Sequence, residues 1–208
     1  MRLIHTSLFA AVAALGLSAC NPPSSDPVNA NPATAEADSQ APATPDTAPA
    51  DATAPAQDAT AVAELAPTQG NETKGSISFK VVDGRVHVTG QVTGLKPGSE
   101  HGFHIHEKGD CSAPDGNSAG GHFNPATQDH GSVTSDPHHG GDMPNITADD
   151  KGVATVDAPV STNVNIGRGD DFDIIGRGLI VHADPDDYTT QPTGNAGARL
   201  ACAVIKAQ

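Results

Sequence analysis

The stretch HGFHIH at residues 101–106 holds the most informative pattern in this chain. His104 and His106 alternate with apolar residues, and side chains two positions apart on a β-strand point to the same face. The two imidazoles would therefore lie side by side, and neutral imidazole is the commonest protein ligand for copper and zinc. A structural histidine needs no partner two residues along. The pattern therefore predicts a strand that carries metal ligands.

Further histidines occur where more ligands could join this pair. Residues 121–125 read GHFNP and residues 138–142 read HHGGD, while His130 lies between these segments and His182 ends a later apolar run. Six of the ten histidines, together with one aspartate, form a set that two metal ions explain better than a structural role does.

Alternating apolar and polar residues before this stretch, and further strand-like segments after it, predict many short β-strands. The strand-like segments are residues 77–81, 86–92, 101–106, 146–148, 153–156, 178–182 and 200–205. Turn sequences such as Asp83-Gly84 and Lys96-Pro97-Gly98 separate them, and no segment has a helical period of useful length. We expect the segments 146–148 and 153–156 to form a hairpin. The whole pattern is typical of an antiparallel sandwich or barrel.

Two long segments, residues 107–142 and 183–198, lack strand character. Long irregular segments in a compact domain are usually functional. They contain histidines of the set above, together with Asp142 and Cys111, so metal and disulfide bonds could supply the order that backbone ladders do not. We expect these segments to build the site.

The charge of the chain argues against nucleic acid as a partner. The chain carries 11 Lys and Arg against 25 Asp and Glu, a formal net charge of −14, and it has no basic run. Residues 74–208 hold ten Lys and Arg against 17 Asp and Glu. The length of this segment suits a single domain with one core.

The N-terminus has the pattern of a lipoprotein signal peptide over residues 1–19. Arg2 gives a short positive region, and the apolar core that follows is too short to span a bilayer as a permanent helix. Residues 17–20 read LSAC, which resembles the lipobox of bacterial lipoproteins, whose cysteine takes lipid. This interpretation predicts an exported protein, anchored to a membrane through Cys20 on the periplasmic side of the cell envelope. The alternative is an ordinary signal peptide that ends by chance in a cysteine.

Residues 20–73 are expected to form a disordered tether after the signal peptide. Of the 53 residues 21–73, 15 are Ala, nine are Pro and seven are Thr, and none is aromatic. Such a segment cannot bury enough apolar surface to offset the entropy lost on ordering. We therefore place the start of the folded domain at residue 74.

The three cysteines divide into two roles. If Cys20 takes lipid, Cys111 and Cys202 remain. Two cysteines in an exported domain most simply form one disulfide, and two free thiols are the alternative.

Five motifs together resemble the copper–zinc superoxide dismutase family. They are GFHIHE at 102–107, GHFNP at 121–125, HGGD at 139–142, VH at 181–182 and GNAGARLAC at 194–202. The resemblance implies an all-β fold, an eight-stranded antiparallel Greek-key β-barrel or sandwich with two long functional loops. It also implies one copper and one zinc per subunit, and it allows a homodimer.

The resemblance assigns the ligands residue by residue. The family's copper ligands fall on His104, His106, His122 and His182, and its zinc ligands fall on His122, His130, His139 and Asp142. His122 would therefore bridge the two metals. Four nitrogens suit a copper that changes oxidation state. Three nitrogens and one carboxylate oxygen complete a four-coordinate zinc with no open position, which is typical of a structural zinc.

The resemblance also implies the reaction and the residues around the metals. The reaction is dismutation of superoxide to molecular oxygen and hydrogen peroxide, which would protect the cell envelope. His122 would carry a proton, and Arg199 would attract and orient the anion beside copper. Asp186 matches the family's aspartate that links a copper ligand to a zinc ligand. The family's disulfide falls on Cys111 and Cys202.

Several neighbouring residues match no ligand position. His87 and His101 are interpreted as non-ligands, and Asn145 is interpreted as a solvated loop residue. His138 competes with His139 for zinc, but the spacing to the following aspartate is the family's when His139 is the ligand.

Two other functions remain open at this point. A non-catalytic copper carrier or copper-storing envelope lipoprotein could use the same fold, although such relatives tend to lack copper ligands or the arginine. A zinc-stabilised structural module of the envelope would show no dependence on copper. The presence of all seven ligand residues and Arg199 favours the enzyme.

Overall fold

Residues 59–208 are described by a computed structural model, and nearly all regular structure in this part of the chain is β-strand. The strands are β1 (Thr60–Pro67), β2 (Lys74–Val82), β3 (Arg85–Thr93), β4 (Glu100–His101), β5 (Phe103–His106), β6 (Ile146–Thr147), β7 (Ala154–Pro159), β8 (Gly178–His182), β9 (Arg199–Val204) and β10 (Lys206–Ala207). A short 3₁₀ helix, η1 (Asn117–Ala119), lies in the first long loop.

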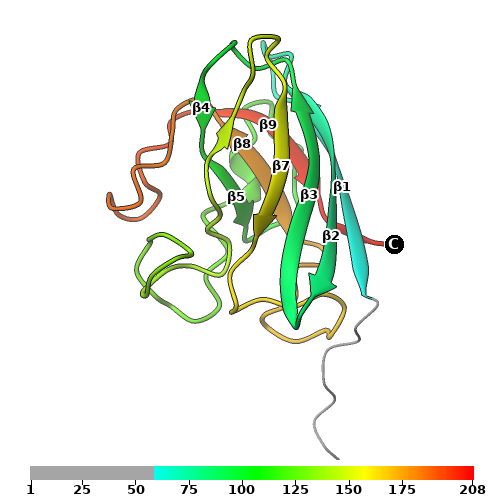
Figure 1. Ribbon diagram of the computed structural model, residues 1–208. Helices are drawn as coiled ribbons and strands as arrows, with labels where there is room; N and C mark the ends of the chain where they lie inside the picture. The colour runs from blue at the N-terminus through cyan, green and yellow to red at the C-terminus, as the bar shows by residue number, and fades with distance from the viewer. Residues whose placement is uncertain (1–58) are drawn as a thin grey trace, which may run out of the picture. The chain divides into compact units, whose positions relative to one another are not determined.

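The main sheet is antiparallel and curls around the core (Figure 1). Its eight strands run in the order β5-β8-β9-β1-β2-β3-β7, with β10 as a further partner of β1. Strands distant in sequence lie side by side, such as β9 with β1 and β7 with β3, and these are the crossovers of a Greek key. The predicted all-β, antiparallel fold class is confirmed.

A two-stranded ladder of β4 and β6 continues the structure beyond the main sheet. β4 and β5 are separated only by Gly102, so they form one interrupted strand that belongs to both sheets. The expected hairpin of residues 146–148 and 153–156 is only partly present. Its turn forms, because Asp149 N donates to Val153 O over 2.9 Å. Its two legs then separate, since β6 pairs with β4 and β7 pairs with β3.

β1 corrects the expected start of the domain. It lies inside the segment interpreted as a tether, yet it pairs with β2, β9 and β10. Ala61, Ala63 and Leu65 point into the core and are no more than 5% exposed. They show the same period of two as the other strands, but alanine buries little apolar surface, so the composition of the segment hid the strand. The tether prediction is therefore wrong for the residues of β1, and the folded domain begins before residue 74.

The hydrophobic core lies inside the curled sheet. Its fully buried side chains come from alternate positions of the strands and include Ile77, Phe79, Val88, Val92, Phe103, Ile105, Leu179 and Val181. Burial of each such side chain contributes about 1.5–3 kcal/mol relative to exposure. β5 and β8 differ from the outer strands because all their residues are buried. A second layer therefore covers the face of these two strands that points away from the core.

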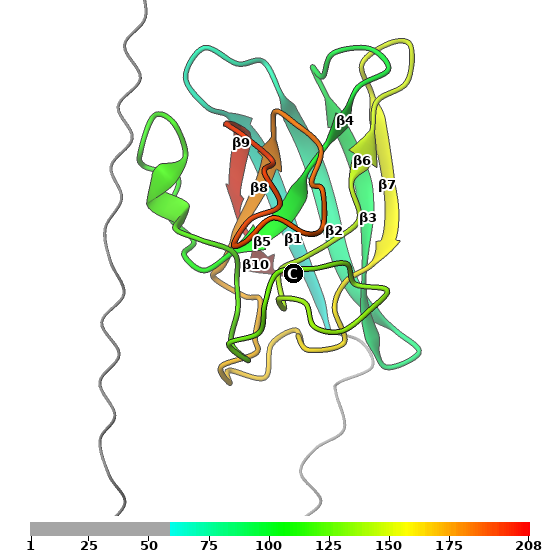
Figure 2. The same cartoon turned by 90° about the vertical axis from the view of Figure 1, so that its left-hand side faces the viewer.

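The covering layer is built by the two long loops. The first connects β5 to β6 and the second, residues 183–198, connects β8 to β9. Both project on the same side of the sheet, at the left of Figure 1, and they face the viewer in Figure 2. The expectation of two long segments without strand character is confirmed.

The predicted signal peptide and Cys20 lie outside the described residues. Within residues 59–208, no helix has both the length and the apolar character needed to cross a membrane.

Candidate metal centre

Two neighbouring strands bring three imidazoles together. On β5, Phe103 and Ile105 pack in the core, whereas the alternate residues His104 and His106 point to the loop-covered face and are fully buried. His182 ends β8, which pairs with β5 along its length. Its Nε2 atom lies 3.3 Å from Nε2 of His106. The alternation of side chains along β5, together with its pairing to β8, is enough to produce this arrangement.

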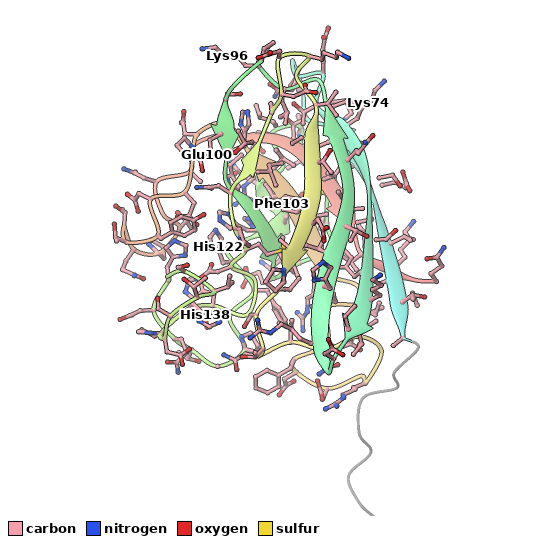
Figure 3. All side chains as sticks on the ribbon, viewed as in Figure 1. Lys74, Lys96, Glu100, Phe103, His122 and His138 are labelled. Atoms are coloured by element: carbon pink, nitrogen blue, oxygen red, sulfur yellow. A yellow bond between two sulfur atoms is a disulfide. The ribbon has the colours of Figure 1, made fainter. Side chains whose placement is uncertain are left out.

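The first long loop folds back along β5 and adds a fourth imidazole. Ile105 N donates to Gly141 O over 2.9 Å, and Phe123 N donates to Ile105 O over 2.9 Å. A β-carbon at Gly141 would collide with the carbonyl oxygen of Ile105, which explains why this position is glycine. The result is a bridge pairing between His122 and His106, which brings His122 against the strand (Figure 3).

The first ligand group contains only imidazoles. It consists of His104, His106, His122 and His182, whose ligand atoms all lie within 4.8 Å of one another. Two of these nitrogens, His104 Nδ1 and His122 Nε2, are buried and have no hydrogen-bond partner in the described part of the chain. Leaving buried polar atoms unpaired is unfavourable, and one metal ion among the four rings would satisfy both. The set suits copper.

The second ligand group gathers around one carboxylate oxygen. The Nδ1 atoms of His122, His130 and His139 lie 2.9, 3.0 and 3.4 Å from Asp142 Oδ1. The other carboxylate oxygen, Oδ2, accepts hydrogen bonds from the backbone N–H groups of His139 and Gly131, at 2.8 and 3.1 Å. The carboxylate is thereby fixed with Oδ1 facing the three rings. Three nitrogens and one oxygen fit a closed, structural zinc site.

One imidazole belongs to both groups. His122 directs Nδ1 toward Asp142 and leaves Nε2 facing the first group, with no hydrogen-bond partner among the described residues. A bridging imidazole must lose both ring protons, which two flanking cations make possible near neutral pH. The geometry of His122 therefore fits a pair of metals joined by one ring.

A second carboxylate contacts one imidazole of each ligand group. Asp186 Oδ2 lies 2.8 Å from His104 Nε2, and Asp186 Oδ1 lies 2.9 Å from His130 Nε2. Both contacts use the ring nitrogen that does not face the ligand cluster, so each fixes the orientation of its imidazole. Asp186, rather than the nearby Asp184 or Asp187, makes these contacts.

Burial sets the protonation of three imidazoles of the first group. Desolvation, reinforced by neighbouring imidazoles, lowers the pKa of His106 and of His182 well below 6.5. The same causes, with His104 as the main neighbour, lower the pKa of His122 to about 4. These three rings are neutral at pH 7, which is the form that binds a metal.

Carboxylates have the opposite effect on His130. Burial would lower its pKa, but hydrogen bonds with Asp142 and Asp186 outweigh burial and raise the pKa to about 9. The same contacts hold the pKa of both carboxyl groups well below the usual range in spite of their burial. In the metal-free protein at pH 7, His130 therefore carries a proton that a metal ion must displace.

Three histidines of the domain lie outside both groups. His101 Nδ1 lies 2.8 Å from the backbone oxygen of His182, and His138 Nε2 lies 3.0 Å from Ser161 Oγ. His87 lies on β3, away from both groups. The second histidine of the HHGGD segment, and not the first, joins the cluster.

Two side-chain amides hold the site together, and the sequence did not reveal either. Asn145, interpreted as a solvated loop residue, is bound to the backbone of Asp186. Its Oδ1 accepts from Asp186 N and its Nδ2 donates to Asp186 O, both over 2.9 Å. Gln191 makes the same pair of bonds to His130, at 2.8 and 2.9 Å. The interpretation of Asn145 as a solvated loop residue is therefore wrong.

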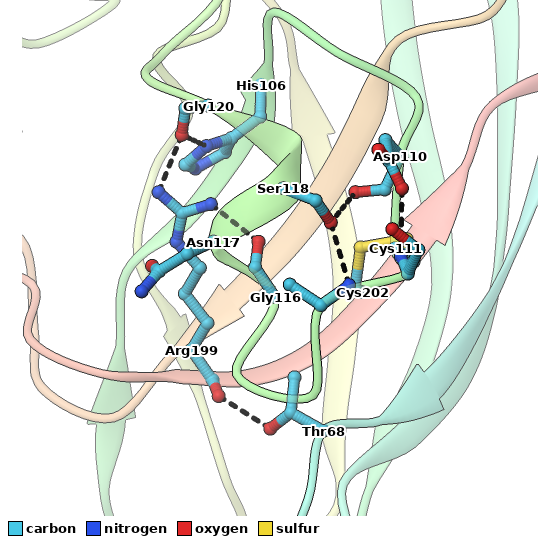
Figure 4. Close-up of a disulfide and its surroundings, with 12 residues drawn as sticks. Thr68, His106, Asp110, Cys111, Gly116, Asn117, Ser118, Gly120, Arg199 and Cys202 are labelled. Atoms are coloured by element: carbon cyan, nitrogen blue, oxygen red, sulfur yellow. Dashed lines mark hydrogen bonds between the residues drawn. A yellow bond between two sulfur atoms is a disulfide. The ribbon is translucent and has the colours of Figure 1, made fainter.

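Arg199 begins β9 and lies beside the first group (Figure 4). Its Nη1 and Nη2 atoms donate to the backbone oxygens of Gly116 and Gly120 over 2.7 and 2.6 Å. The oxygen of Gly120 also lies 2.9 Å from His106 Nδ1, so the guanidinium and a candidate ligand share one acceptor. Partial burial lowers the pKa of Arg199 below its usual range. Arginine nevertheless remains charged at neutral pH.

An open cavity of about 420 Å³ gives access to this part of the site, and it is lined by Arg199, His106 and His182 among others. A larger groove of about 770 Å³ lies on β1, β2, β3 and β7, but no imidazole lines it. The smaller cavity is therefore the one that carries the chemistry.

The disulfide joins the first long loop to β9. Cys111 and Cys202 are bonded, with 5.8 Å between their Cα atoms. Figure 4 shows the bond next to the loop that holds Arg199. The predicted pairing is confirmed.

Comparison with known proteins decides the family. Residues 73–205 match the family model of copper/zinc superoxide dismutase. The chain belongs to this family. Membership in the copper/zinc superoxide dismutases accounts for both ligand groups, and it confirms the family resemblance seen in the five motifs.

Individual relatives agree with this assignment. A copper–zinc superoxide dismutase of Aquifex aeolicus is 41% identical over 147 residues, which is 69% of this chain and 85% of the relative. One from Mesembryanthemum crystallinum is 42% identical, over 66% of this chain and 90% of the relative.

Solved structures are similar as well. The clock protein EA4 is 38% identical, with a TM-score of 0.64, over 73% of this chain and 96% of that one. A mutant of a superoxide dismutase-like protein from Bacillus subtilis is 36% identical, with a TM-score of 0.62, over 69% of this chain and 95% of that one.

Proposed function

We propose that this member of the family removes superoxide by dismutation, so that two superoxide ions and two protons give one molecule of oxygen and one of hydrogen peroxide. The observation that carries the proposal is the shared ring of His122, which faces both ligand groups. In this proposal copper is held by His104, His106, His122 and His182, and zinc is held by His122, His130, His139 and Asp142.

The chemistry divides between the metal and the chain. Copper, when bound, supplies the electron exchange through its two oxidation states. His122 can hold a proton at Nε2, which has no hydrogen-bond partner among residues 59–208, and can give it to the reduced oxygen species. Arg199 supplies a fixed positive charge next to His106, where a small anion would be attracted and oriented.

The zinc side has a structural task in this proposal. Asp142 holds three imidazoles from one oxygen, and Asp186 fixes the far nitrogens of His104 and His130. These contacts keep the ring of His122 at a constant orientation between the two groups. A closed zinc site can therefore tune the bridge without touching the substrate.

Metal binding should release protons in two steps. Zinc binding to the metal-free protein at pH 7 is expected to release about one proton from His130, because a ligand imidazole must be unprotonated at its metal-bound nitrogen. This release should disappear as the pH rises through about 9, where the metal-free His130 loses the proton by itself. Adding copper to the zinc-loaded protein should release about one more, from His122, if this ring bridges both metals.

Titration calorimetry in buffers of different ionisation enthalpy measures both numbers. The wild-type protein at pH 7 and pH 10 provides its own control for the zinc step. Copper binding without a released proton would show that His122 does not bridge.

We propose in addition that the enzyme is exported and anchored to a membrane of the cell envelope through a lipid on Cys20, where it removes superoxide. The support is the sequence of residues 1–20. Cys20→Ala should move the protein from the membrane to the soluble fraction with unchanged dismutase activity per metal-loaded protein. Each buried CH₂ of an acyl chain contributes about 0.8 kcal/mol to membrane binding. Cell fractionation measures the effect, and a wild-type protein found only in the soluble fraction would refute the anchor.

A further inference from the structure

His130 differs from the ligands of the first group in how its backbone is held. It lies in the first long loop, outside every strand and every isolated bridge. Its N–H donates to Gln191 Oε1 over 2.8 Å, and its carbonyl oxygen accepts from Gln191 Nε2 over 2.9 Å. One side-chain amide therefore satisfies both backbone groups, as a neighbouring strand would.

The same short segment also covers the ring of His130. Gly194 has a φ of +63°, and a β-carbon there would collide with His130 Nε2 and with Asp186 Oδ1. Residues 191–194 of the second loop thus contact His130 on its backbone side through Gln191 and on its ring side through Gly194. Any side chain larger than hydrogen at 194 would separate His130 from Asp186.

The four ligands of the first group have other supports. His104, His106 and His182 belong to β5 and β8, and His122 is paired with β5. The ladder bonds of these strands hold their ligands without help from a side chain. For His130, the two hydrogen bonds from Gln191 take the place of the bonds that a neighbouring strand would make to its backbone.

We infer that Gln191 is a positioning residue for His130 and that its two hydrogen bonds limit the rate at which zinc leaves the site. A ligand whose backbone is fixed returns to the metal after each brief dissociation, whereas a loosened ligand exposes the metal to water and to competing ligands. The inference rests on the proposed role of His130 as a zinc ligand.

Gln191 also connects the zinc ligand to the cavity beside Arg199. Thr193, two residues further on, lines that cavity. Loss of the bonds between Gln191 and His130 should therefore increase hydrogen exchange of the backbone over residues 189–198 while zinc is still bound.

Two pairs of variants test the inference. Gln191→Met keeps the length of the side chain and removes both bonds, and Gln191→Glu places a carboxylate against the carbonyl oxygen of His130. The matched controls are Gln128→Met and Gln128→Glu. Gln128 is exposed, lies two residues before His130, and its side chain donates only to Ala126 O, at 3.1 Å.

The measurement is the rate of zinc transfer from the copper- and zinc-loaded protein to a chromogenic chelator, well below the unfolding temperature. Gln191→Met should release zinc roughly 10-fold faster than wild type, since two hydrogen bonds are lost. Gln191→Glu should be faster still, and both Gln128 variants should match wild type. The rate of copper release should stay unchanged in all five proteins, because the strands hold the copper ligands.

The other possible results of this experiment contradict either the inference or the proposed function. Equal zinc release from wild type and the Gln191 variants would overturn the inference, and so would a parallel rise in copper release, which would indicate general destabilisation. A wild-type protein that binds no zinc at this site would instead overturn the proposed function.

Discussion

Arg199→Glu is expected to lower the rate of superoxide removal by roughly 10- to 100-fold at low ionic strength, with both metals still bound. The substrate is an anion, and the whole chain has a formal net charge of −14, which repels it. Among the described residues that line the cavity, Arg199 is the one lysine or arginine, and Asp115 is also present. The attraction at the site therefore depends on this guanidinium and on copper. Such steering is known for superoxide dismutases as a class.

The salt dependence of the rate shows whether local attraction or overall repulsion of the anion dominates. Salt screens exposed charges over about 8–10 Å, so it weakens the local attraction and the overall repulsion together. In the wild type the local attraction should dominate, and the rate should fall as salt increases. In Arg199→Glu the slope should flatten or reverse. Stopped-flow or pulse-radiolysis rates at several salt concentrations provide the measurement.

Arg199→Lys is the matched control. It keeps the positive charge but cannot donate to the oxygens of Gly116 and Gly120 in the same two-pronged way. It should keep the downward salt slope with a smaller loss of rate. A metal-replete Arg199→Glu protein with the rate and slope of the wild type would show that Arg199 does not guide the substrate.

Reduction of the disulfide is expected to have the largest effect on stability. The sequence separation of Cys111 and Cys202 is 91 residues. On the chain-entropy model, a loop of this size corresponds to roughly 4–5 kcal/mol in the free energy of unfolding. Cys111 also fixes the loop whose backbone oxygens hold Arg199, so reduction should flatten the salt dependence of the rate as well. Thermal unfolding of the oxidised and reduced metal-loaded proteins measures the first effect.

A double variant, Cys111→Ser with Cys202→Ser, separates the bond from the reductant. It should unfold like the reduced wild type, and added reductant should not change it further. If the oxidised and reduced wild-type proteins unfolded at the same temperature, the disulfide would have no stabilising role.

The sequence was sufficient for the features that depend on local periodicity. Alternation along β5 predicted that His104 and His106 share a face, and the motifs located His122, Asp142 and the rest of both clusters. Strands β2 and β3 also follow from their alternating residues, and β8 and β9 follow from short apolar segments. These predictions succeeded because both patterns are properties of neighbouring residues.

Features that depend on distant contacts could not be predicted from the sequence. β1 was hidden because Ala61 and Ala63 give a weak apolar signal, and their burial depends on pairing with β2 and β9. Asn145 and Gln191 are polar residues in loops, and their bonds to Asp186 and His130 exist only because the two loops pack together. A single sequence contains no periodic signal for such contacts.

Superoxide decay after a radiolysis pulse is the most direct test of dismutation at a copper bridged to zinc by His122. The decay should be followed with the protein loaded with copper and zinc, with zinc alone, and without metal, after metal analysis of each sample. The copper- and zinc-loaded protein should accelerate the decay in proportion to its concentration, and the other two should leave it at the rate in buffer. A copper- and zinc-replete protein that leaves the decay at the buffer rate would contradict catalysis and would indicate a carrier or storage protein instead.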